Sequence, residues 1–202
     1  MINKVDLGRI ALAIAEAEKK TAAEIAVVVG RKAGGYHLVP ISWAACAALA
    51  LPALLLASFN LTAHLLYGIE LIVFGALAFI LSVGSHRHRL VPGRMKRRRA
   101  HEAAREQFMA RRISRTQARS SVLLYVALAE RYVELVPGSG ISEQLDDALW
   151  KPVIVRLTEG IKHNRTADGI VAAVENCGAI LAQHFPPRGE NRDELGNEVV
   201  LL

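Results

Sequence analysis

The feature that most constrains the fold is residues 33–69, a stretch without a single Asp, Glu, Lys or Arg. Within it, residues 38–58 (LVPISWAACAALALPALLLAS) supply about the 20 apolar residues that a helix needs to cross a bilayer. A second apolar run of similar length, residues 65–84, follows a short polar break. Pro52 inside the first run is compatible with this interpretation, because membrane helices tolerate proline. We therefore expect a transmembrane hairpin of two helices over residues 38–84.

Charge is distributed unevenly around these runs. Residues 86–119 carry twelve Lys and Arg against two acids, whereas residues 120–202 carry seven bases against twelve acids. The loop between the apolar runs has no Lys or Arg, so the positive-inside rule places both flanks of the hairpin in the cytoplasm. The sequence thus predicts a two-helix protein of the cell inner membrane, with both termini and the soluble domain cytoplasmic.

The basic segment that follows the hairpin, residues 85–99, is expected to face the inner leaflet. Acidic phospholipids attract such clusters by about 1 kcal/mol per basic residue near the surface. A nucleic-acid binder usually extends its basic face over the folded domain, which is acidic here, so we expect no nucleic-acid partner. The predicted membrane-surface contacts are Arg87, Arg89, Arg94, Lys96, Arg97, Arg98 and Arg99. Glu70, near the start of the second run, either reaches the outer interface or supports self-association.

The first thirty residues predict a helix followed by a strand. Asp6 is placed to cap the helix, and Glu16 and Lys20 are spaced as a favourable i, i+4 pair. The β-branched run EIAVVVG, which Gly30 ends, predicts the strand. A helix and a strand cannot bury a core alone. We therefore expect residues 1–30 and 100–202 to form one discontinuous α/β domain, into which the hairpin is inserted.

After the hairpin, residues 95–112 predict a helix, and residues 121–138 predict two strands with a tight turn at Glu130–Arg131. The first of these strands is apolar throughout, as in a strand covered on both faces, and the second alternates, as nearer an edge. The tail DELGNEVVLL either adds a short strand or binds a neighbour.

Two further helices are expected in the C-terminal part of the chain. One is capped by Ser142 and kinked or divided by Pro152. The last begins near Thr166 and ends at Pro186, with Cys177 and His184 as core or boundary residues on its inner face.

Five segments together resemble the TPM domain family: EKKTAAEIAVVV, AREQF, SVLLYVALAERYVELVPGSGI, LDDALW and ADGIVAAVENCGAILAQHFP. That family includes a thylakoid-lumen acid phosphatase linked to photosystem II repair and many bacterial membrane proteins. The resemblance implies an α/β/α sandwich around a small, mostly four-stranded sheet.

The resemblance also implies a candidate site. Some members bind divalent cations such as calcium through acidic residues, so Asp146 and Asp147 are candidate ligands for calcium or magnesium, and Asp147 and Asp168 candidate catalytic residues. Hard cations need several converging oxygens, however. Arg119–Ser120 stands where the family usually has Asn or Asp with Gly, and Pro137–Ser139 stands where an acid is expected.

Sharp catalytic motifs are missing from the sequence. It contains no GxxxxGK[ST] phosphate loop, no HExxH and no Cys-x5-Arg arrangement. Two hypotheses follow. We favour a non-catalytic membrane-anchored module that helps to assemble, repair or modulate membrane protein complexes. The alternative is a membrane-anchored, acid phosphatase-like enzyme that depends on a divalent cation.

Overall fold

The computed structural model describes residues 2–36, 38–58, 62–83, 91–111, 113, 120–187 and 196–202. It divides into two compact units. Unit 1 comprises Met1–Ala33 and Arg97–Leu202, and unit 2 comprises Gly34–Lys96. The chain thus leaves unit 1 after its first strand and returns to it within a helix.

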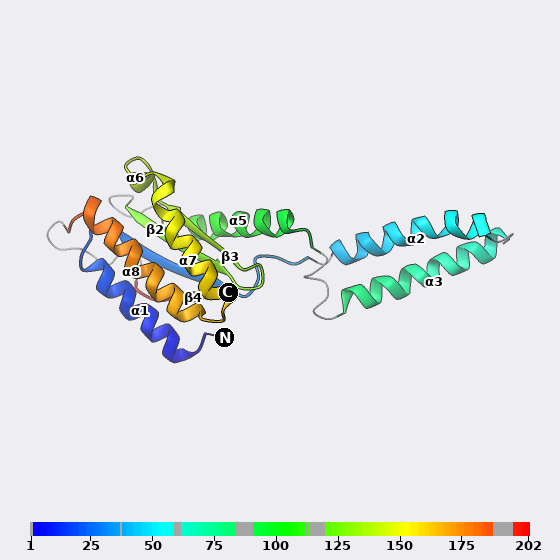
Figure 1. Ribbon diagram of the computed structural model, residues 1–202, viewed down its shortest axis with the longest axis horizontal. Helices are drawn as coiled ribbons and strands as arrows, with labels where there is room; N and C mark the ends of the chain where they lie inside the picture. Colours follow the sequence, from blue (N-terminus) through cyan, green and yellow to red (C-terminus); the bar gives the residue numbers. More distant parts are fainter. Residues whose placement is uncertain are drawn as a thin grey trace. The chain divides into compact units, whose positions relative to one another are not determined.

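Unit 1 holds a sheet and the helices that cover it, and unit 2 holds an antiparallel pair of apolar helices (Figure 1). In chain order the elements are α1 (Lys4–Glu18), β1 (Glu24–Gly30), α2 (Leu38–Ser58), α3 (Ala63–Ser82), α5 (Gly93–Ala110), β2 (Ser121–Ala127), β3 (Tyr132–Pro137), α6 (Ser139–Ser142), the 3-10 helix η2 (Asp147–Trp150), α7 (Lys151–Lys162), α8 (Thr166–His184) and β4 (Val200–Leu201).

The sheet has four strands in the order β3-β2-β1-β4. β1 pairs in parallel with β2, with Glu24 opposite Ser121, and also in parallel with β4. β2 and β3 form an antiparallel hairpin whose turn includes Arg131, at a φ of 50°. The predicted turn and the edge position of β3 are therefore confirmed. Of the two alternatives for the tail, a strand is the one observed.

Helices cover both faces of the sheet. Side chains of α1, α7 and α8 pack against one face, formed in β2 by Val122, Leu124 and Val126. The alternate residues of β2, Leu123, Tyr125 and Ala127, face a smaller core. α5 closes that core through Ala100 and Ala104. Every residue of β2 is buried, as its continuous apolar sequence predicted. The predicted mixed α/β fold around a small four-stranded sheet is confirmed.

The start of α1 differs in detail from the prediction. Asn3, not Asp6, caps this helix: the Asp6 backbone N–H donates to Asn3 Oδ1 over 2.7 Å. Asp6 accepts from the Asn3 backbone N–H over 3.0 Å in return, which completes a capping box. Glu16 bonds Lys19 at 2.6 Å rather than Lys20, so the pair has i, i+3 spacing.

The region from Ser142 to Ile161 also differs from the predicted capped helix. Ser142 ends the short helix α6 instead of starting a longer one. Asp146 caps the 3-10 helix η2, and Pro152 lies in the first turn of α7, where its missing N–H costs no hydrogen bond. Pro152 therefore helps to start a helix rather than kinking one.

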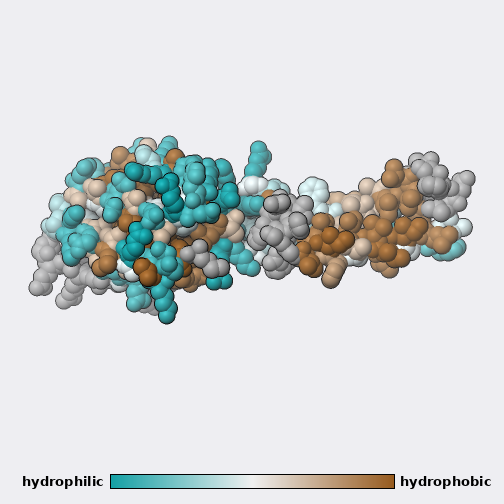
Figure 2. Space-filling view, turned by 60° about the horizontal axis from the view of Figure 1, so that its bottom comes forward, coloured by the Kyte–Doolittle hydropathy of each residue, from teal (hydrophilic) through white to brown (hydrophobic). Residues whose placement is uncertain are grey.

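Unit 2 consists mainly of α2 and α3, which pack against each other. Ala44 and Ala48, one turn apart on α2, are buried, and such small residues let two helices approach closely. α3, all of which the structure describes, has no buried residue. Brown, apolar residues cover this part of the surface in Figure 2, in contrast to the mainly teal surface of unit 1.

Among the described residues one helix, α3, is long and apolar enough to cross a membrane, with a mean hydropathy of 2.2. The apolar stretch in α2, Leu38–Pro52, is shorter. The second spanning helix of the expected hairpin therefore stays a prediction.

Candidate functional site

The candidate ligands Asp146 and Asp147 lie at the start of η2. Asp146 Oδ1 accepts a hydrogen bond from the Ala148 backbone N–H over 2.8 Å, so this carboxylate caps the 3-10 helix. Asp147 is the first residue of η2 and is exposed. Both acids thus have an ordinary role at a helix start, where negative charge is favourable.

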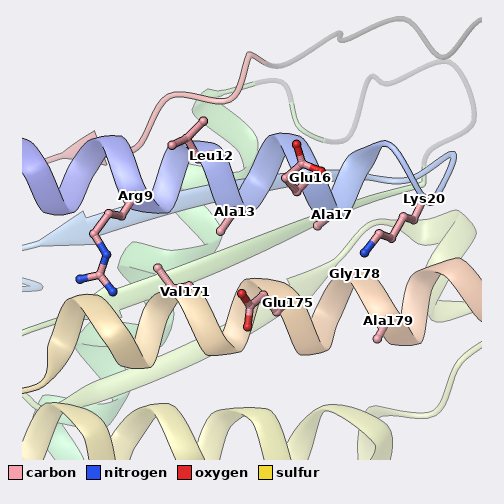
Figure 3. A pocket seen from close by; sticks show the side chains of 10 residues that line it. All are labelled: Arg9, Leu12, Ala13, Glu16, Ala17, Lys20, Val171, Glu175, Gly178 and Ala179. Atoms are coloured by element: carbon pink, nitrogen blue, oxygen red, sulfur yellow. The ribbon is translucent and has the colours of Figure 1, made fainter.

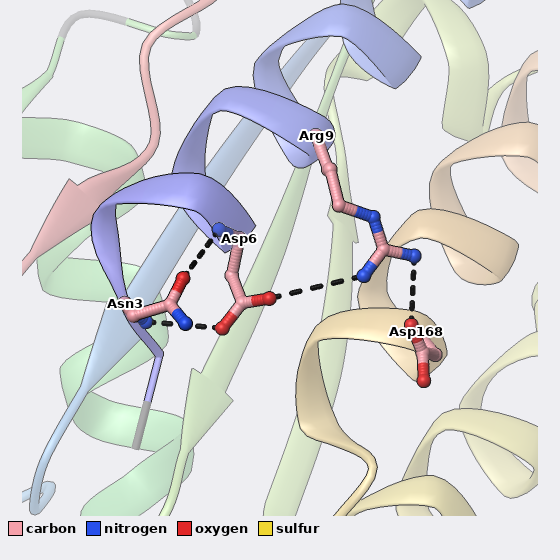
Figure 4. Close-up of polar contacts among 4 residues, drawn as sticks. All are labelled: Asn3, Asp6, Arg9 and Asp168. Atoms are coloured by element: carbon pink, nitrogen blue, oxygen red, sulfur yellow. Dashed lines mark hydrogen bonds and ion pairs between the residues drawn. The ribbon is translucent and has the colours of Figure 1, made fainter.

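Asp168 lies in the first turn of α8 and pairs with α1. Arg9 Nη2 donates to Asp168 Oδ1 over 2.8 Å, and Arg9 Nη1 lies 3.8 Å from Asp6 Oδ1 (Figure 4). This chain of contacts joins the N-terminal ends of α1 and α8 and gives Asp168 a structural partner.

The structure does not bring the two candidate catalytic acids together. Asp147 precedes α7 and Asp168 follows it, so a helix of 12 residues separates them. At a rise of about 1.5 Å per residue, α7 spans roughly 18 Å. In the part of the chain that the structure describes, no three His, Cys, Asp or Glu side chains are grouped to hold a metal ion.

Cys177, predicted as a core or boundary residue, is buried in the core between the helices and the sheet. Burial raises the pKa of its thiol to about 12, because the thiolate would lose its hydration. His184 on the same helix is exposed. Cys177 is therefore a core residue, as predicted, and is protonated at physiological pH.

Most of the predicted lipid-contacting residues lie in the first turns of α5. Arg94, Arg97, Arg98 and Arg99 are exposed and Lys96 is half-buried; Arg87 and Arg89 lie outside the described residues. Arg98 and Arg99 bind Glu102 at 2.9 and 3.4 Å, and the Arg98 hydrogen bond lowers the pKa of Glu102. Glu102 thus offsets part of the positive charge.

A polar network that the sequence analysis missed joins α5 to β3. His101 Nδ1 lies 2.6 Å from Glu134 Oε1, and the Tyr132 hydroxyl donates to Glu134 Oε2 over 2.9 Å. Burial and the adjacent Glu134 charge raise the pKa of Tyr132. Strand side chains alternate between the two faces, so the sequence alone could have placed Tyr132 and Glu134 on the same face of β3. The approach of His101 depends on tertiary packing.

One cavity lies at the carboxyl ends of the parallel strands, where open α/β sheets commonly bind ligands. Its volume is about 400 Å³, and its lining residues are Ile2, Val29, Arg31, Leu128, Leu201 and Leu202. The lining is apolar apart from Arg31 and includes no acidic side chain. The described residues of this lining therefore offer a divalent cation no Asp or Glu carboxylate.

A larger groove, of about 520 Å³, runs between α1 and α8 (Figure 3). Small residues line its floor because the helices touch there: a Cβ added to Gly178 would lie 2.6 Å from Ala17 Cβ. Leu12 and Val171 are the larger apolar residues beside the groove. We call this surface the α1–α8 groove; its residues are Arg9, Leu12, Ala13, Glu16, Ala17, Lys20, Val171, Glu175, Gly178 and Ala179.

The charges along the α1–α8 groove differ in how they are compensated. Arg9 pairs with Asp168, and Glu16 accepts a hydrogen bond from Lys19, which lowers the pKa of Glu16. The side chains of Lys20 and Glu175 make no hydrogen bond or ion pair with any residue that the structure describes, although the nearby charge of Lys20 contributes to lowering the pKa of Glu16. The groove thus presents one acidic and one basic group that are available to a ligand.

Comparison with known proteins finds a family match over part of the chain and a similar fold. Residues 90–180 match the family model described as the TPM domain. The BA42 protein of the psychrophilic bacterium Bizionia argentinensis, solved by NMR, superposes with a TM-score of 0.63 at 17% identity, covering 100% of this chain and 96% of that one. At this identity the likeness concerns the fold alone. No curated protein matches the chain.

Proposed function

From the match of residues 90–180 to the TPM domain, we propose a membrane-anchored protein in which unit 1 is a non-catalytic interaction module that helps to assemble, repair or modulate membrane protein complexes. The proposal has two parts, an anchor in unit 2 and a binding function in unit 1. They depend on different observations and are tested separately.

The observation that carries the anchor is the exposure of α3. Leu71 and Ile72 in this helix are each 72% exposed, and Phe79 is 70% exposed. A helix that is apolar on all sides is stable in water only when protein buries it, whereas lipid accepts it directly. Together with the apolar sequence of α2, this supports insertion of unit 2 into a membrane, for which we propose the inner membrane; the basic flanks of the hairpin support a cytoplasmic unit 1.

The basic half of α5 extends the anchor to the membrane surface in this proposal. Its exposed arginines would contact acidic phospholipid head groups, as the sequence analysis predicts. Vesicle binding by the full chain should then rise with the share of acidic lipid and fall with salt.

The binding function is preferred over catalysis because the candidate acids do not converge. Asp147 and Asp168 lie at opposite ends of α7, Asp168 is engaged by Arg9, and the described residues that line the cavity at the strand ends include no Asp or Glu. A cation-dependent phosphatase-like enzyme, the alternative, would need several such oxygens in one place.

Extraction of membranes with alkaline carbonate tests the anchor. The wild-type full chain should remain in the pellet, and Ile72→Arg should release it, because a charge near the bilayer centre costs about 3 kcal/mol on insertion scales. Val155→Arg is the matched control: Val155 is an exposed apolar residue of α7 in unit 1. Release of the wild-type protein, or equal release of both variants, would contradict the anchor.

Hydrolysis of an aryl phosphate tests the absence of catalysis. The detergent-purified full chain should show no activity above a mock purification with calcium, magnesium or a chelator. Activity that Asp147→Asn or Asp168→Asn abolishes, in a variant that still folds, would establish the phosphatase-like alternative.

A further inference from the structure

We propose that the α1–α8 groove binds an amphipathic helix from the cytoplasmic juxtamembrane region of another membrane protein, with a Lys or Arg of that helix on Glu175. The inference rests on the proposed function, since it names the kind of partner that the interaction module would hold. It is carried by the shape of the groove and by its uncompensated charges.

The shape of the groove fits a helix. From Arg9 to the end of α1 at Glu18 the α1 wall extends over about two and a half helical turns, or roughly 13 Å, and Lys20 follows just beyond the helix. Ala13, Ala17 and Gly178 line the floor, so no long side chain keeps a third helix away. Helices pack at axial distances of about 8–10 Å when the side chains between them are small.

The apolar part of the groove provides the area for binding. Leu12 is 68% exposed on the α1 side although it belongs to an amphipathic helix, and Val171 lies on the α8 side. Figure 3 shows Val171 between the two helices and Leu12 on the edge of α1 that faces away from α8, with Arg9 at one end and Lys20 at the other. A helix-in-groove ligand would cover both with apolar residues at i, i+3 and i+4 spacing.

The charged residues of the groove determine which charges the ligand helix carries and in which order they follow along it. α1 and α8 run parallel, since Arg9 pairs with Asp168 and Ala17 touches Gly178. Glu175, one turn before Gly178, therefore lies nearer the middle of the groove, and Lys20 lies at its far end. The complementary helix carries a base at its centre and an acid one to two turns away, so that each pairs with one of these groups.

The source of the ligand follows from the location of the module. Cytoplasmic segments next to membrane helices carry an excess of Lys and Arg. When amphipathic, such segments combine the apolar face and the central base that the α1–α8 groove requires. An anchored unit 1 would meet them at the surface of the same membrane.

Site-specific photocrosslinking in intact cells tests the inference. A benzophenone amino acid replaces Leu12 in the full chain, and the same amino acid in place of Val155 is the control, because Val155 is similarly exposed but lies on α7. We expect an adduct at position 12 and not at 155. Peptide mapping should place it in a basic, amphipathic cytoplasmic segment of a membrane protein.

Charge exchange then tests the role of Glu175. A peptide of the mapped segment should bind the purified full chain at least tenfold more weakly after Glu175→Lys, and exchange of the central base of the peptide for Glu should restore binding. Glu143→Lys, at an exposed acid outside the groove, should leave affinity unchanged.

Several outcomes would overturn the inference: no adduct at position 12 beyond the control, an adduct with a second copy of this chain, or a mapped segment without basic residues. If the protein resists carbonate extraction while any of these occurs, the anchor stands and the groove assignment fails. If the wild-type protein is released by carbonate, the proposed function fails independently of the crosslink.

Discussion

Helices α3 and α7 show how the same apolar residue types serve two different environments. In α7, Val153, Leu157 and Ile161 recur every four residues and are buried against α8 and the sheet, while charged residues cover the other side. In α3, apolar residues occur all round the helix and none is buried. The apolar stripe of α7 is therefore buried inside unit 1, whereas the apolar surface of α3 is left exposed by the protein. Substitutions whose effect depends on burial should therefore lower the free energy of unfolding more in unit 1 than in unit 2.

The two units should differ most in stability when a large apolar side chain is removed. Trp150 is 2% exposed in the main core of unit 1, so Trp150→Ala should lower the free energy of unfolding by about 3–5 kcal/mol. Ile72→Ala in α3 should change it by much less in detergent, because no protein core surrounds Ile72. Chemical unfolding of the full chain in detergent, followed by circular dichroism, measures both. Equal losses would show that α3 is packed like a core helix.

A smaller difference in stability between the units is expected when a glycine is replaced by alanine. Gly178→Ala places a Cβ 2.6 Å from Ala17 Cβ, so α1 and α8 must separate, at a cost of about 1–3 kcal/mol. A Cβ on Gly75 of α3 meets nothing within 4 Å, and Gly75→Ala should be neutral or stabilising. The same unfolding measurement applies. A neutral Gly178→Ala would mean that the two helices separate at little cost.

The buried thiol of Cys177 should make the free energy of unfolding depend on pH. The buried Cys177 thiol has its pKa raised to about 12, against an ordinary value of 9.0. The unfolded state therefore loses this proton first, and Cys177 makes stability fall as pH rises from about 9 to 12, by at most about 1.4 kcal/mol per pH unit. Cys177→Ala should flatten the pH dependence in that range relative to wild type.

Maleimide labelling checks the burial of Cys177 directly. In the folded protein at pH 8 the reagent should leave Cys177 unmodified until denaturant is added. Rapid native labelling of Cys177 would contradict its assignment to the core.

The smallest effect is expected at the surface of unit 1. Arg9 and Asp168 are bonded at 2.8 Å, but their side chains are 50% and 60% exposed. Exposed pairs typically contribute about 0.2–1 kcal/mol, and salt screens them. A double-mutant cycle with Arg9→Ala and Asp168→Ala should give a coupling energy in this range, smaller at high salt. A larger value would indicate that the pair holds α1 to α8.

Much of the fold was predictable because local patterns and tertiary packing agree. The alternation in β3 put Val133 and Leu135 on one face and Glu134 on the other, which matches the burial of the strand. β4 could not be chosen in advance, because two residues have no periodicity and their pairing depends on the free edge of β1. Pro152 was misplaced because η2, which ends just before it, has no apolar repeat of its own.

The candidate site was less predictable than the fold. The separation of Asp147 from Asp168 follows from the length of α7, which the sequence already indicated. The α1–α8 groove was not visible, because a groove is defined by which helices become neighbours. The small size of Ala17 and Gly178 suggests close packing somewhere, but the sequence does not say against which partner.

The position of the hairpin between β1 and its partner β2 has a consequence for synthesis on the ribosome. Glu24 pairs with Ser121, so β1 emerges and then waits for roughly a hundred further residues, which takes about 5–20 seconds at bacterial elongation rates. During that interval α2 and α3 are made, and the apolar β1 has neither of its neighbouring strands. Delivery of the nascent chain to the membrane would thus precede completion of the sheet, and a chaperone that shields Glu24–Gly30 would act in that window.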